Sequence, residues 1–518
     1  MRIVRGIGGM AAVVVGALSV AGAAGAATPT DTSALESATN VGALTANPDP
    51  NAGLARHLKT WQAIADASNG NRSTGTAGHE ASAKYVFDTL TAAGYQPRYQ
   101  NFIATVFREV TDPTFARTAP TPQTYVDGTD FLTMEFSPSG SVVDTPTIAI
   151  DYTTPTDQAS ASSSGCEATD FPSGTAGRIA LLQRGTCDFL IKAQNAQAAG
   201  AVAAVIYNEG TTGDQNADRR DVLSGTLGAN TLTIPVIGTS YEVGNTLRTT
   251  PGARATVITD TVTDNLPTKN VIADTAGRAD RTVVVGAHLD SVPEGPGVND
   301  DGSGSATDLE IAVQMKRLAI KPYNRVRFIW FSGEEQGLLG SQFYVDQLTK
   351  REVQDHLAML DFDMLGSPNW GRFVYDGDGS DGGPAGPAGS GVVERVFAEW
   401  YAQRGLYVET DEFDGRSDYD GFTTAGIPAG GITTGADGVK THAQWLRWGG
   451  IEGAIYDQCY HQLCDRYPEN IDRAELENSV DAVAHAIGTF AMSTSSIKGT
   501  AKGTPAKPFD YEGDQLVR

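Results

Sequence analysis

The chain has few basic residues, few cysteines and no long apolar run beyond its first residues. It carries 38 Lys and Arg against 62 Asp and Glu, which gives a formal net charge of −24. Because this excess of negative charge repels phosphate backbones, we expect no nucleic-acid partner. After the N-terminal segment no stretch reaches the roughly 18 consecutive apolar residues that a membrane span needs, so we expect no membrane association.

The four cysteines form two close pairs in the sequence, Cys166 with Cys187 and Cys459 with Cys464. Neither pair has the C-x-x-C spacing of common zinc–thiolate sites, which makes zinc binding the weaker interpretation. Residues 1–27 combine a basic start, a short apolar centre and small residues, as in a secretory signal peptide. In an exported chain the two pairs predict two disulfides, and we expect a secreted, extracellular protein.

The length of the chain suggests about three domain-sized parts. Residues 28–45 are rich in Ala, Thr and Ser and predict a spacer or propeptide remnant, while residues 494–518 predict a flexible or processed tail. We expect a catalytic domain in two parts, 46–139 and 263–493, separated by an inserted β-rich region at 140–262. In the second catalytic part strand-like runs alternate with helical patterns, which predicts an α/β fold with a mostly parallel central sheet flanked by helices.

Local patterns support both parts of this division. Leu54–Ala67 and Ala81–Ala93 have helical apolar spacing, and Gly94 is a C-cap signal for the second helix. Inside the insert, Gly177–Phe189 (GRIALLQRGTCDF) predicts a strand and a glycine turn. A helical stretch and the strand-like run Ala201–Asn208 (AVAAVIYN) follow. This succession resembles the protease-associated (PA) domain, which implies an inserted module and not a catalyst.

Five side chains of the kinds that bind metals lie close to points where apolar runs stop. They are His288, Asp300, Glu335, Asp363 and His461. Ligands in α/β sheets bind at the carboxyl ends of strands, which is where these residues are expected. Two imidazoles and three carboxylates offer nitrogen and oxygen donors without thiolate, and one carboxylate can bridge two divalent ions. The sequence therefore predicts hydrolysis at a two-metal centre.

Each of these residues also has an ordinary interpretation when taken alone. A histidine at a strand end is most often structural, but Asp290 lies two residues after His288, and metal-bound imidazoles usually contact a carboxylate. Asp300 could be only an acidic helix cap. Glu334 and Glu335 could be a solvated pair, but they follow six mostly apolar residues. Two carboxylates at a buried strand end need cations or a proton.

The phrases GAHLDSV, GVNDDGSG, FSGEEQGLLGS, DFDMLGSPN, DGRSD and YDQCYHQLCD occur in this order. Over about residues 54–102 and 270–492 the chain resembles secreted bacterial co-catalytic di-zinc aminopeptidases, a family of leucyl-aminopeptidase-like metallopeptidases. The resemblance implies two Zn²⁺ per chain and a bridging hydroxide as the nucleophile. The ligand sets that it implies are His288, Asp300 and Asp363 for one ion, and Asp300, Glu335 and His461 for the other.

The resemblance also implies roles for residues around the metals. Glu334 matches the general base, Tyr460 the phenol that steadies the developing oxyanion, and Asp290 the partner of His288. Arg416 and Gly415 match positions that line the site of the substrate amine and backbone. The pair Cys459 and Cys464 matches the family's disulfide.

The sequence departs from the family pattern near the substrate. Thr433 aligns where well-known members have an aromatic wall of the side-chain pocket, and Asp418-Tyr419-Asp420 replaces an expected histidine-bearing phrase. A calcium ion, as in some relatives, could use Glu477 and Asp481, although acidic residues on a C-terminal helix more often face solvent.

These observations predict a secreted zinc aminopeptidase that acts, as a monomer, on peptides and proteins with a free N-terminus. A carboxypeptidase or dipeptidase on the same di-zinc fold is the first alternative, and Arg416 in the DGRSD phrase favours the aminopeptidase. A non-catalytic binding protein is the second alternative. Because all five expected ligands and Glu334 are present, the site itself weighs against that alternative.

Overall fold

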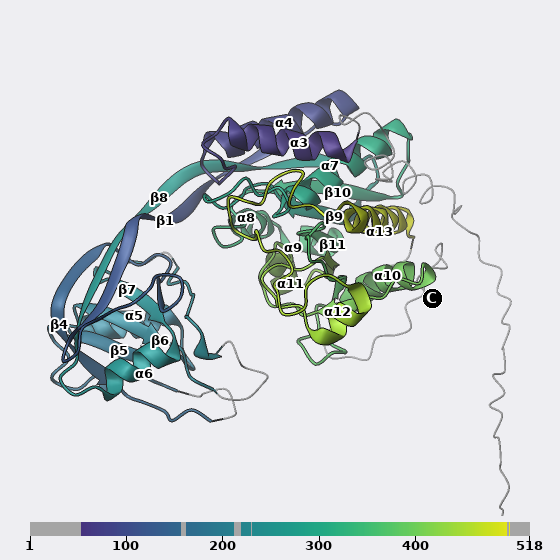
Figure 1. Ribbon diagram of the computed structural model, residues 1–518. Helices are drawn as coiled ribbons and strands as arrows, with labels where there is room; N and C mark the ends of the chain where they lie inside the picture. The colour runs from purple at the N-terminus through teal and green to yellow at the C-terminus, as the bar shows by residue number, and fades with distance from the viewer. Residues whose placement is uncertain (1–52, 157–161, 212–218, 229, 495–496, 498–518) are drawn as a thin grey trace, which may run out of the picture.

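The computed structural model describes residues 53–156, 162–211, 219–228, 230–494 and 497. The signal peptide expected at 1–27, the spacer at 28–45 and most of the tail at 494–518 therefore lie outside the described residues. The described part forms two lobes, which a ribbon of two long strands joins (Figure 1).

The ribbon consists of β1 (Arg98–Ala119) and β8 (Arg254–Asp274), which pair antiparallel (Figure 1). The pairing begins with Arg98 opposite Ile272 in the larger lobe and continues into the smaller lobe. Residues 108–112 of β1 are all exposed, as expected for the part that crosses between the lobes. The chain thus leaves and re-enters the larger lobe at one place.

The larger lobe is built on a sheet with the strand order β13-β12-β14-β11-β9-β10-β8. Strands β14, β11, β9 and β10 are parallel, whereas β8 and β12 run antiparallel to β10 and β14. The strands are β9 (Arg278–His288), β10 (Asn324–Phe331), β11 (His356–Phe362), β12 (Phe373–Tyr375), β13 (Glu409–Asp411) and β14 (Ala429–Thr433). The predicted α/β fold with a mostly parallel sheet is confirmed.

Helices cover both faces of this sheet because its central strands are apolar on both sides. Val283 and Val285 of β9 belong to one core, and Val284 between them belongs to another. The first face carries α3 (Leu54–Asp66), α4 (Ala77–Ala93), α7 (Gly302–Arg317), α10 (Ser390–Gln403) and α13 (Arg473–Met492). The second face carries α8 (Leu339–Asp346), α9 (Lys350–Asp355) and α11 (Tyr419–Thr424). Helix α12 (His442–Trp448) packs beside β12 through Trp448.

The two helices expected near the start of the catalytic domain are α3 and α4. The second ends at Gly94, whose φ of 93° is the left-handed conformation that a glycine C-cap adopts without strain. It begins at Ala77, four residues before the expected start, because the Thr76 side chain accepts a hydrogen bond from the backbone N–H of His79.

The smaller lobe has its own parallel strands and its own cores. Strands β4 (Gly140–Ile150), β5 (Ile179–Gln183), β6 (Ala203–Tyr207) and β7 (Val236–Thr239) are parallel, with α5 (Phe189–Ala198) and α6 (Tyr241–Thr249) on opposite faces. The remaining elements are β2 (Gln123–Thr124), β3 (Phe131–Thr133) and the 3₁₀ helix η1 (Ala168–Asp170). Because β3 pairs with β7, residues before the expected start of the insert at 140 also belong to this lobe's sheet.

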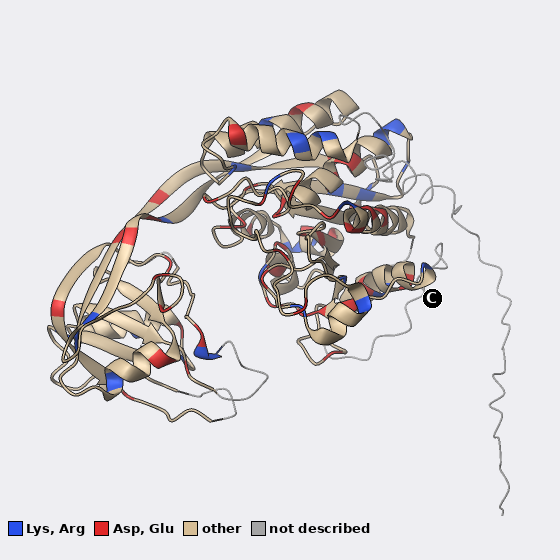
Figure 2. Ribbon diagram, viewed as in Figure 1, with Lys and Arg blue, Asp and Glu red and all other residues tan. Residues whose placement is uncertain are grey.

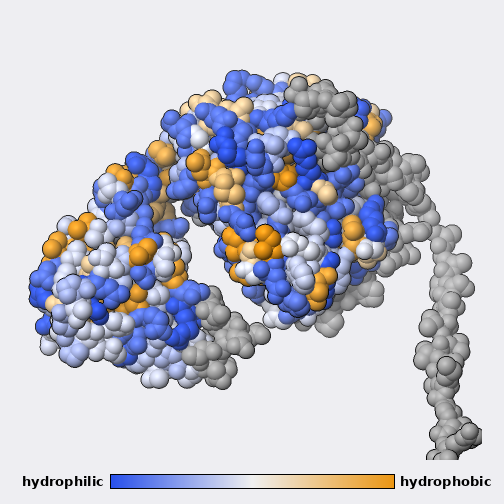
Figure 3. Space-filling view, in the orientation of Figure 1, coloured by the Kyte–Doolittle hydropathy of each residue, from blue (hydrophilic) through white to orange (hydrophobic). Residues whose placement is uncertain are grey.

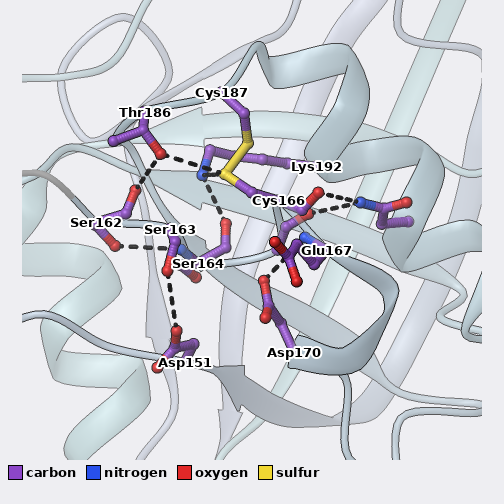
Figure 4. The surroundings of a disulfide bond; sticks show 12 residues. Asp151, Ser162, Ser163, Ser164, Cys166, Glu167, Asp170, Thr186, Cys187 and Lys192 are labelled. Atoms are coloured by element: carbon purple, nitrogen blue, oxygen red, sulfur yellow. Dashed lines mark hydrogen bonds between the residues drawn. A yellow bond between two sulfur atoms is a disulfide. The ribbon is translucent and has the colours of Figure 1, made fainter.

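Both predicted disulfides are present: Cys166–Cys187 in the smaller lobe and Cys459–Cys464 in the larger lobe. Figure 4 shows Lys192 beside the first of these bonds. Its amino group donates to the Ser164 carbonyl oxygen at 2.6 Å and lies 3.6 Å from Cys166 Sγ. Burial lowers the pKa of Lys192 to about 8. The disulfide and Lys192 together attach the segment that contains Ser164 and Cys166 to helix α5 and the loop before it.

Acidic and basic side chains are distributed over both lobes, as Figure 2 shows. The visible surface is mostly hydrophilic, with apolar residues gathered on the larger lobe near α11 (Figure 3). No helix in the part of the chain that the structure describes combines the length and the apolar character needed to span a membrane.

Candidate metal centre

The five expected ligands meet at the carboxyl ends of the central parallel strands. His288 is the last residue of β9, Asp363 follows β11, and Glu335 follows β10. Asp300 lies just before α7, and His461 lies in the loop between α12 and α13. The strands of one parallel sheet end at the same edge, which is why residues far apart in the sequence converge here.

Asp300 lies between two groups of ligand-type side chains. Its Oδ1 is 3.2 Å from His288 Nε2, and its Oδ2 is 3.2 Å from His461 Nε2. On the first side Asp363 Oδ1 lies 3.7 Å from His288 Nε2. On the second side Glu335 Oε2 lies 3.1 Å from His461 Nε2. The two groups, each with donor atoms within 4.8 Å of one another, therefore share one carboxylate.

The donor atoms of this centre fit metal ions. Glu335 Oε1 and Asp363 Oδ1 are buried, and no group in the described part of the chain donates a hydrogen bond to them. Burial, followed by the charge of Asp300, raises the pKa of Glu335 to about 7. Burial disfavours the charged form of His461, but hydrogen bonds to Asp300 and Glu335 outweigh it and raise the pKa of His461 to about 10. Without a metal the carboxylates thus draw protons to the site, and cations bound by nitrogen and oxygen donors would replace them.

Asp290 holds the loops of the centre in place. Its Oδ1 accepts hydrogen bonds from the backbone N–H of Gly333 at 2.9 Å and of Glu334 at 3.3 Å, and its Oδ2 accepts from Thr74 Oγ1 at 3.0 Å. His288 Nδ1 lies 3.1 Å from the Asp290 carbonyl oxygen and 3.9 Å from its carboxylate. Asp290 is therefore the neighbour of His288, as expected, but its backbone makes the closer contact and its carboxylate positions the Glu334 loop.

Glu334 and Tyr460 lie beside the two groups. Glu334 Oε2 is 3.8 Å from His288 Nε2, and burial raises the pKa of Glu334 well above the ordinary value for a glutamate. The Tyr460 ring stacks on the His461 ring with centroids 3.8 Å apart. Burial and the charge of Asp300 raise the pKa of Tyr460, so its phenol keeps its proton and is a hydrogen-bond donor.

A cavity of about 270 Å³ opens beside the centre, and Asp300, Glu334 and Asp363 form part of its wall. Arg416 and Thr433 also line it, as the sequence led us to expect. The other lining residues are Met364, Phe373, Tyr375, Asp411, Asp414, Ser417, Tyr419, Gly435, Ala436, Asp437, Gly438, Tyr456, Tyr460 and His461. All of them come from the larger lobe.

The segment around Arg416 is held by its neighbours. Gly415, one residue before, donates its backbone N–H to the Tyr419 hydroxyl at 2.9 Å and is not part of the cavity wall. The Arg416 guanidinium donates to both carboxylate oxygens of Asp437, at 3.0 and 3.2 Å. Ser417 Oγ donates to Asp363 Oδ2 at 2.9 Å, which links this segment to the centre.

Comparisons with known proteins identify the family. Two family models match: peptidase family M28 over residues 270–487 and the PA domain over residues 141–247. An aminopeptidase of Pseudomonas aeruginosa is 42% identical over 443 residues, which cover 85% of this chain and 81% of that protein. The chain belongs to peptidase family M28. A probable lipoprotein aminopeptidase of Mycobacterium tuberculosis, LpqL, is 39% identical to this M28 chain over 452 residues, or 84% of each protein.

Solved structures share the fold of this M28 peptidase. The aminopeptidase from Aneurinibacillus sp. strain AM-1 matches with a TM-score of 0.66 and 23% identity, over 93% of this chain and 100% of that one. BSAP, a zinc aminopeptidase from Bacillus subtilis, matches with a TM-score of 0.58 and 24% identity, over 86% and 97%. The predictions of an enzyme of an aminopeptidase family and of an inserted PA domain are confirmed.

Two residues that fix the centre of this M28 peptidase were not predicted from the sequence. Arg72 is fully buried, and its guanidinium donates to the carbonyl oxygens of Leu289, Pro296 and Gly297 in the loop between His288 and Asp300. Asp465 accepts from the backbone N–H groups of Asn299 at 2.8 Å and Asp300 at 3.1 Å. Neither has a local signal, except that Asp465 directly follows the disulfide-bonded Cys464.

The calcium ligands expected on α13 of this M28 chain do not form a cluster. Within the described ranges, neither Glu477 nor Asp481 belongs to a group of three or more side chains able to hold one ion. The third such group, besides the two at the centre, is Asp376, Asp378 and Glu394 near β12 and α10. Calcium binding by Glu477 and Asp481 stays a prediction.

Proposed function

We propose that this M28 peptidase is a secreted aminopeptidase that removes N-terminal residues from peptides and proteins at a centre of two zinc ions. The observation that carries the proposal is the position of Asp300, whose two oxygens each lie 3.2 Å from a different imidazole. A carboxylate shared between two groups of nitrogen and oxygen donors suits two borderline divalent ions held close together.

The proposed ligands are those expected from the sequence: His288, Asp300 and Asp363 for one ion, and Asp300, Glu335 and His461 for the other. When bound, the ions would polarise the scissile carbonyl and lower the pKa of water to about 7, so that hydroxide is available. Glu334 would take a proton at its carboxylate and pass it to the leaving amine. Tyr460 would donate a hydrogen bond to the carbonyl oxygen as negative charge develops there.

Two observations favour an aminopeptidase over a carboxypeptidase. A carboxypeptidase needs a cation that is free to bind the C-terminal carboxylate. The arginine of the cavity wall, Arg416, is already paired with both oxygens of Asp437. The wall also carries several carboxylates, among them Glu334 and Asp363, which suit the ammonium group of a free N-terminus.

Export from the cell forms part of the proposal. All four cysteines are paired in disulfides, which persist in oxidising compartments. The relative LpqL is itself named a probable lipoprotein. The signal expected at 1–27 would direct the export, and detection of the protein, shortened at its N-terminus, in the culture medium would test this part.

Three forms of one peptide test the activity: free at both ends, N-acetylated, and C-terminally amidated. The zinc-loaded protein should release the first residue from the free and amidated forms and leave the acetylated form intact, as read by mass spectrometry. Cleavage of the acetylated form but not of the amidated one would support the carboxypeptidase. A dipeptide serves as a fourth substrate, and hydrolysis of this substrate alone would support the dipeptidase. No hydrolysis of any of the four would support the non-catalytic binding protein.

A further inference from the structure

The cavity beside the metal centre contains a row of side chains that ends at Asp411. In the sheet Thr433 of β14 is paired with Phe373 of β12, and Tyr375 of β12 is paired with Asp411 of β13. Paired residues share a face of a sheet, as do residues two apart on one strand. Thr433, Phe373, Tyr375 and Asp411 therefore lie on one face, and all four line the cavity.

The row begins beside the metal centre and leads away from it. Strand β14 runs parallel to β11 with Ile432 opposite Phe362, so Thr433 lies next to the proposed ligand Asp363. Asp411 lies two strands further on, a separation of about 10 Å at about 4.8 Å per strand. A side chain that extends from the centre to Asp411 must be long, and its stem must pass the rings of Phe373 and Tyr375.

The Asp411 carboxylate differs from its neighbour Glu409 because it forms no ion pair with any residue that the structure describes. Two residues earlier on β13, Glu409 pairs with Arg447 and accepts from Gln444 Nε2 at 2.8 Å. Among the residues that the structure describes, no Lys, Arg or His forms an ion pair with Asp411, and the nearby Arg416 is paired with Asp437. A carboxylate in such a place is stabilised when a cation arrives and completes the pair.

The surroundings of Asp411 agree with this description. Burial, followed by the charge of Asp414, raises the pKa of Asp411 to about 6, although a hydrogen bond from the Glu412 backbone N–H and the charge of Arg416 act in the opposite direction. Asp414 itself is engaged, because its Oδ1 accepts from the Tyr419 hydroxyl at 2.9 Å and from the Arg416 backbone N–H at 3.0 Å. Among the described carboxylates at this end of the cavity, Asp411 is thus the one whose charge is balanced neither by an ion pair nor by a side-chain hydrogen bond.

We propose that Asp411 binds the cationic end of an N-terminal arginine or lysine, and that the enzyme therefore prefers basic N-terminal residues. The aromatic walls contact the aliphatic stem, and the charge meets Asp411 at the end of the row. This inference rests on the proposed aminopeptidase function, and it adds the class of residue that the enzyme removes.

Arginine and citrulline test the inference directly, because citrulline has nearly the same shape and no charge. We expect kcat/KM for an arginyl anilide to exceed that for the citrullyl anilide by on the order of 10-fold or more, the usual range for a hydrogen bond to a charged group. Asp411→Asn should bring this ratio close to one, because kcat/KM for the arginyl anilide should fall much further than kcat/KM for the citrullyl anilide.

Glu412→Gln is the matched control. It removes the same charge one residue away, from a side chain that lies against Gly383 and not in the cavity wall. The arginine to citrulline ratio should stay at the wild-type value, since exposed charges outside the contact are largely screened by salt.

The outcomes separate this inference from the proposed function. Wild-type cleavage of leucyl, citrullyl and arginyl anilides with equal kcat/KM would overturn the basic preference and leave the aminopeptidase intact. An unchanged ratio in a folded, zinc-loaded Asp411→Asn variant would do the same. If the wild type cleaved none of the three substrates, the proposed function would fail first.

Discussion

Each lobe has a sheet of parallel strands with helices on both faces, and in each a glutamate with a buried or nearly buried side chain follows a strand. In the smaller lobe Glu209 follows β6 and is paired with Arg219 at 3.6 Å. In the larger lobe Glu334 follows β10 and faces His288 and further carboxylates instead. The comparison teaches that a carboxylate at the end of a buried strand is an ordinary structural feature when an arginine neutralises its charge. When several such carboxylates face one another and no arginine neutralises them, they can bind cations or exchange protons.

The largest effect that separates the lobes should come from replacing the two glutamates. Glu334→Gln removes a proton acceptor but no proposed ligand, so kcat should fall by about 10²- to 10⁴-fold with zinc content unchanged. Glu209→Gln, the matched change in the smaller lobe, should leave kcat at the wild-type value. Equal kcat values for the two variants would contradict the assignment of the chemistry to the larger lobe.

Removing each of the two disulfides should have a different effect: one removal should lower stability alone, and the other should also weaken zinc binding. The Cys166–Cys187 bond closes a span of 21 residues, so replacing both cysteines by serine should lower the free energy of unfolding of the smaller lobe by about 3 kcal/mol. Activity should not change. Replacing Cys459 and Cys464 instead should weaken zinc retention, because His461 lies within the loop that this bond closes.

Denaturation curves and zinc content after dialysis against a chelator measure the two effects. Loss of zinc from the variant lacking Cys166 and Cys187 would contradict the proposed difference between the two disulfides. Full retention of zinc in the variant lacking Cys459 and Cys464 would contradict it as well.

The smallest effect should follow removal of the smaller lobe. Glu109 of β1 pairs with Thr261 of β8, so an Asn-Gly turn placed between them would close the ribbon as a hairpin. Because none of the smaller-lobe residues that the structure describes lines the cavity, kcat/KM for a short anilide should not change. A rise for long peptides alone would assign a steric role to the lobe, and loss of activity on the short substrate in a zinc-loaded protein would show that the lobe supports the site itself.

The sequence predicted those parts of the fold that follow from local patterns. Gly94 ends α4 as its C-cap signal indicated, and the apolar runs before His288 and Glu334 are buried strands. The expected limit of the insert at 262 falls inside β8, however, since a half-exposed strand that passes from one lobe to the other has no change of composition at the point of crossing. The pairing of β3 with β7 was likewise hidden, because it joins residues about 100 apart.

At the site, too, some residues could be predicted from local sequence patterns and others could not. The five ligand-type residues were predictable because each stands close to the end of an apolar run or in a recognisable phrase, and the structure brings all five together. The residues that hold them were not predictable. The contacts of Arg72 with carbonyl oxygens more than 200 residues later, and those of Asp465 with the backbone of Asp300, depend on how loops meet in space and leave no periodicity in the sequence.

Zinc content per chain, measured by elemental mass spectrometry on the wild type, His288→Ala and Asp300→Ala, tests the central claim most directly. If Asp300 is shared by two ions, the wild type should hold two zinc ions and His288→Ala should retain the ion bound by Glu335 and His461. Asp300→Ala should weaken both sites, because each loses a ligand. Full activity of the wild type with a single zinc ion, or loss of only one ion from Asp300→Ala, would contradict the shared two-metal centre.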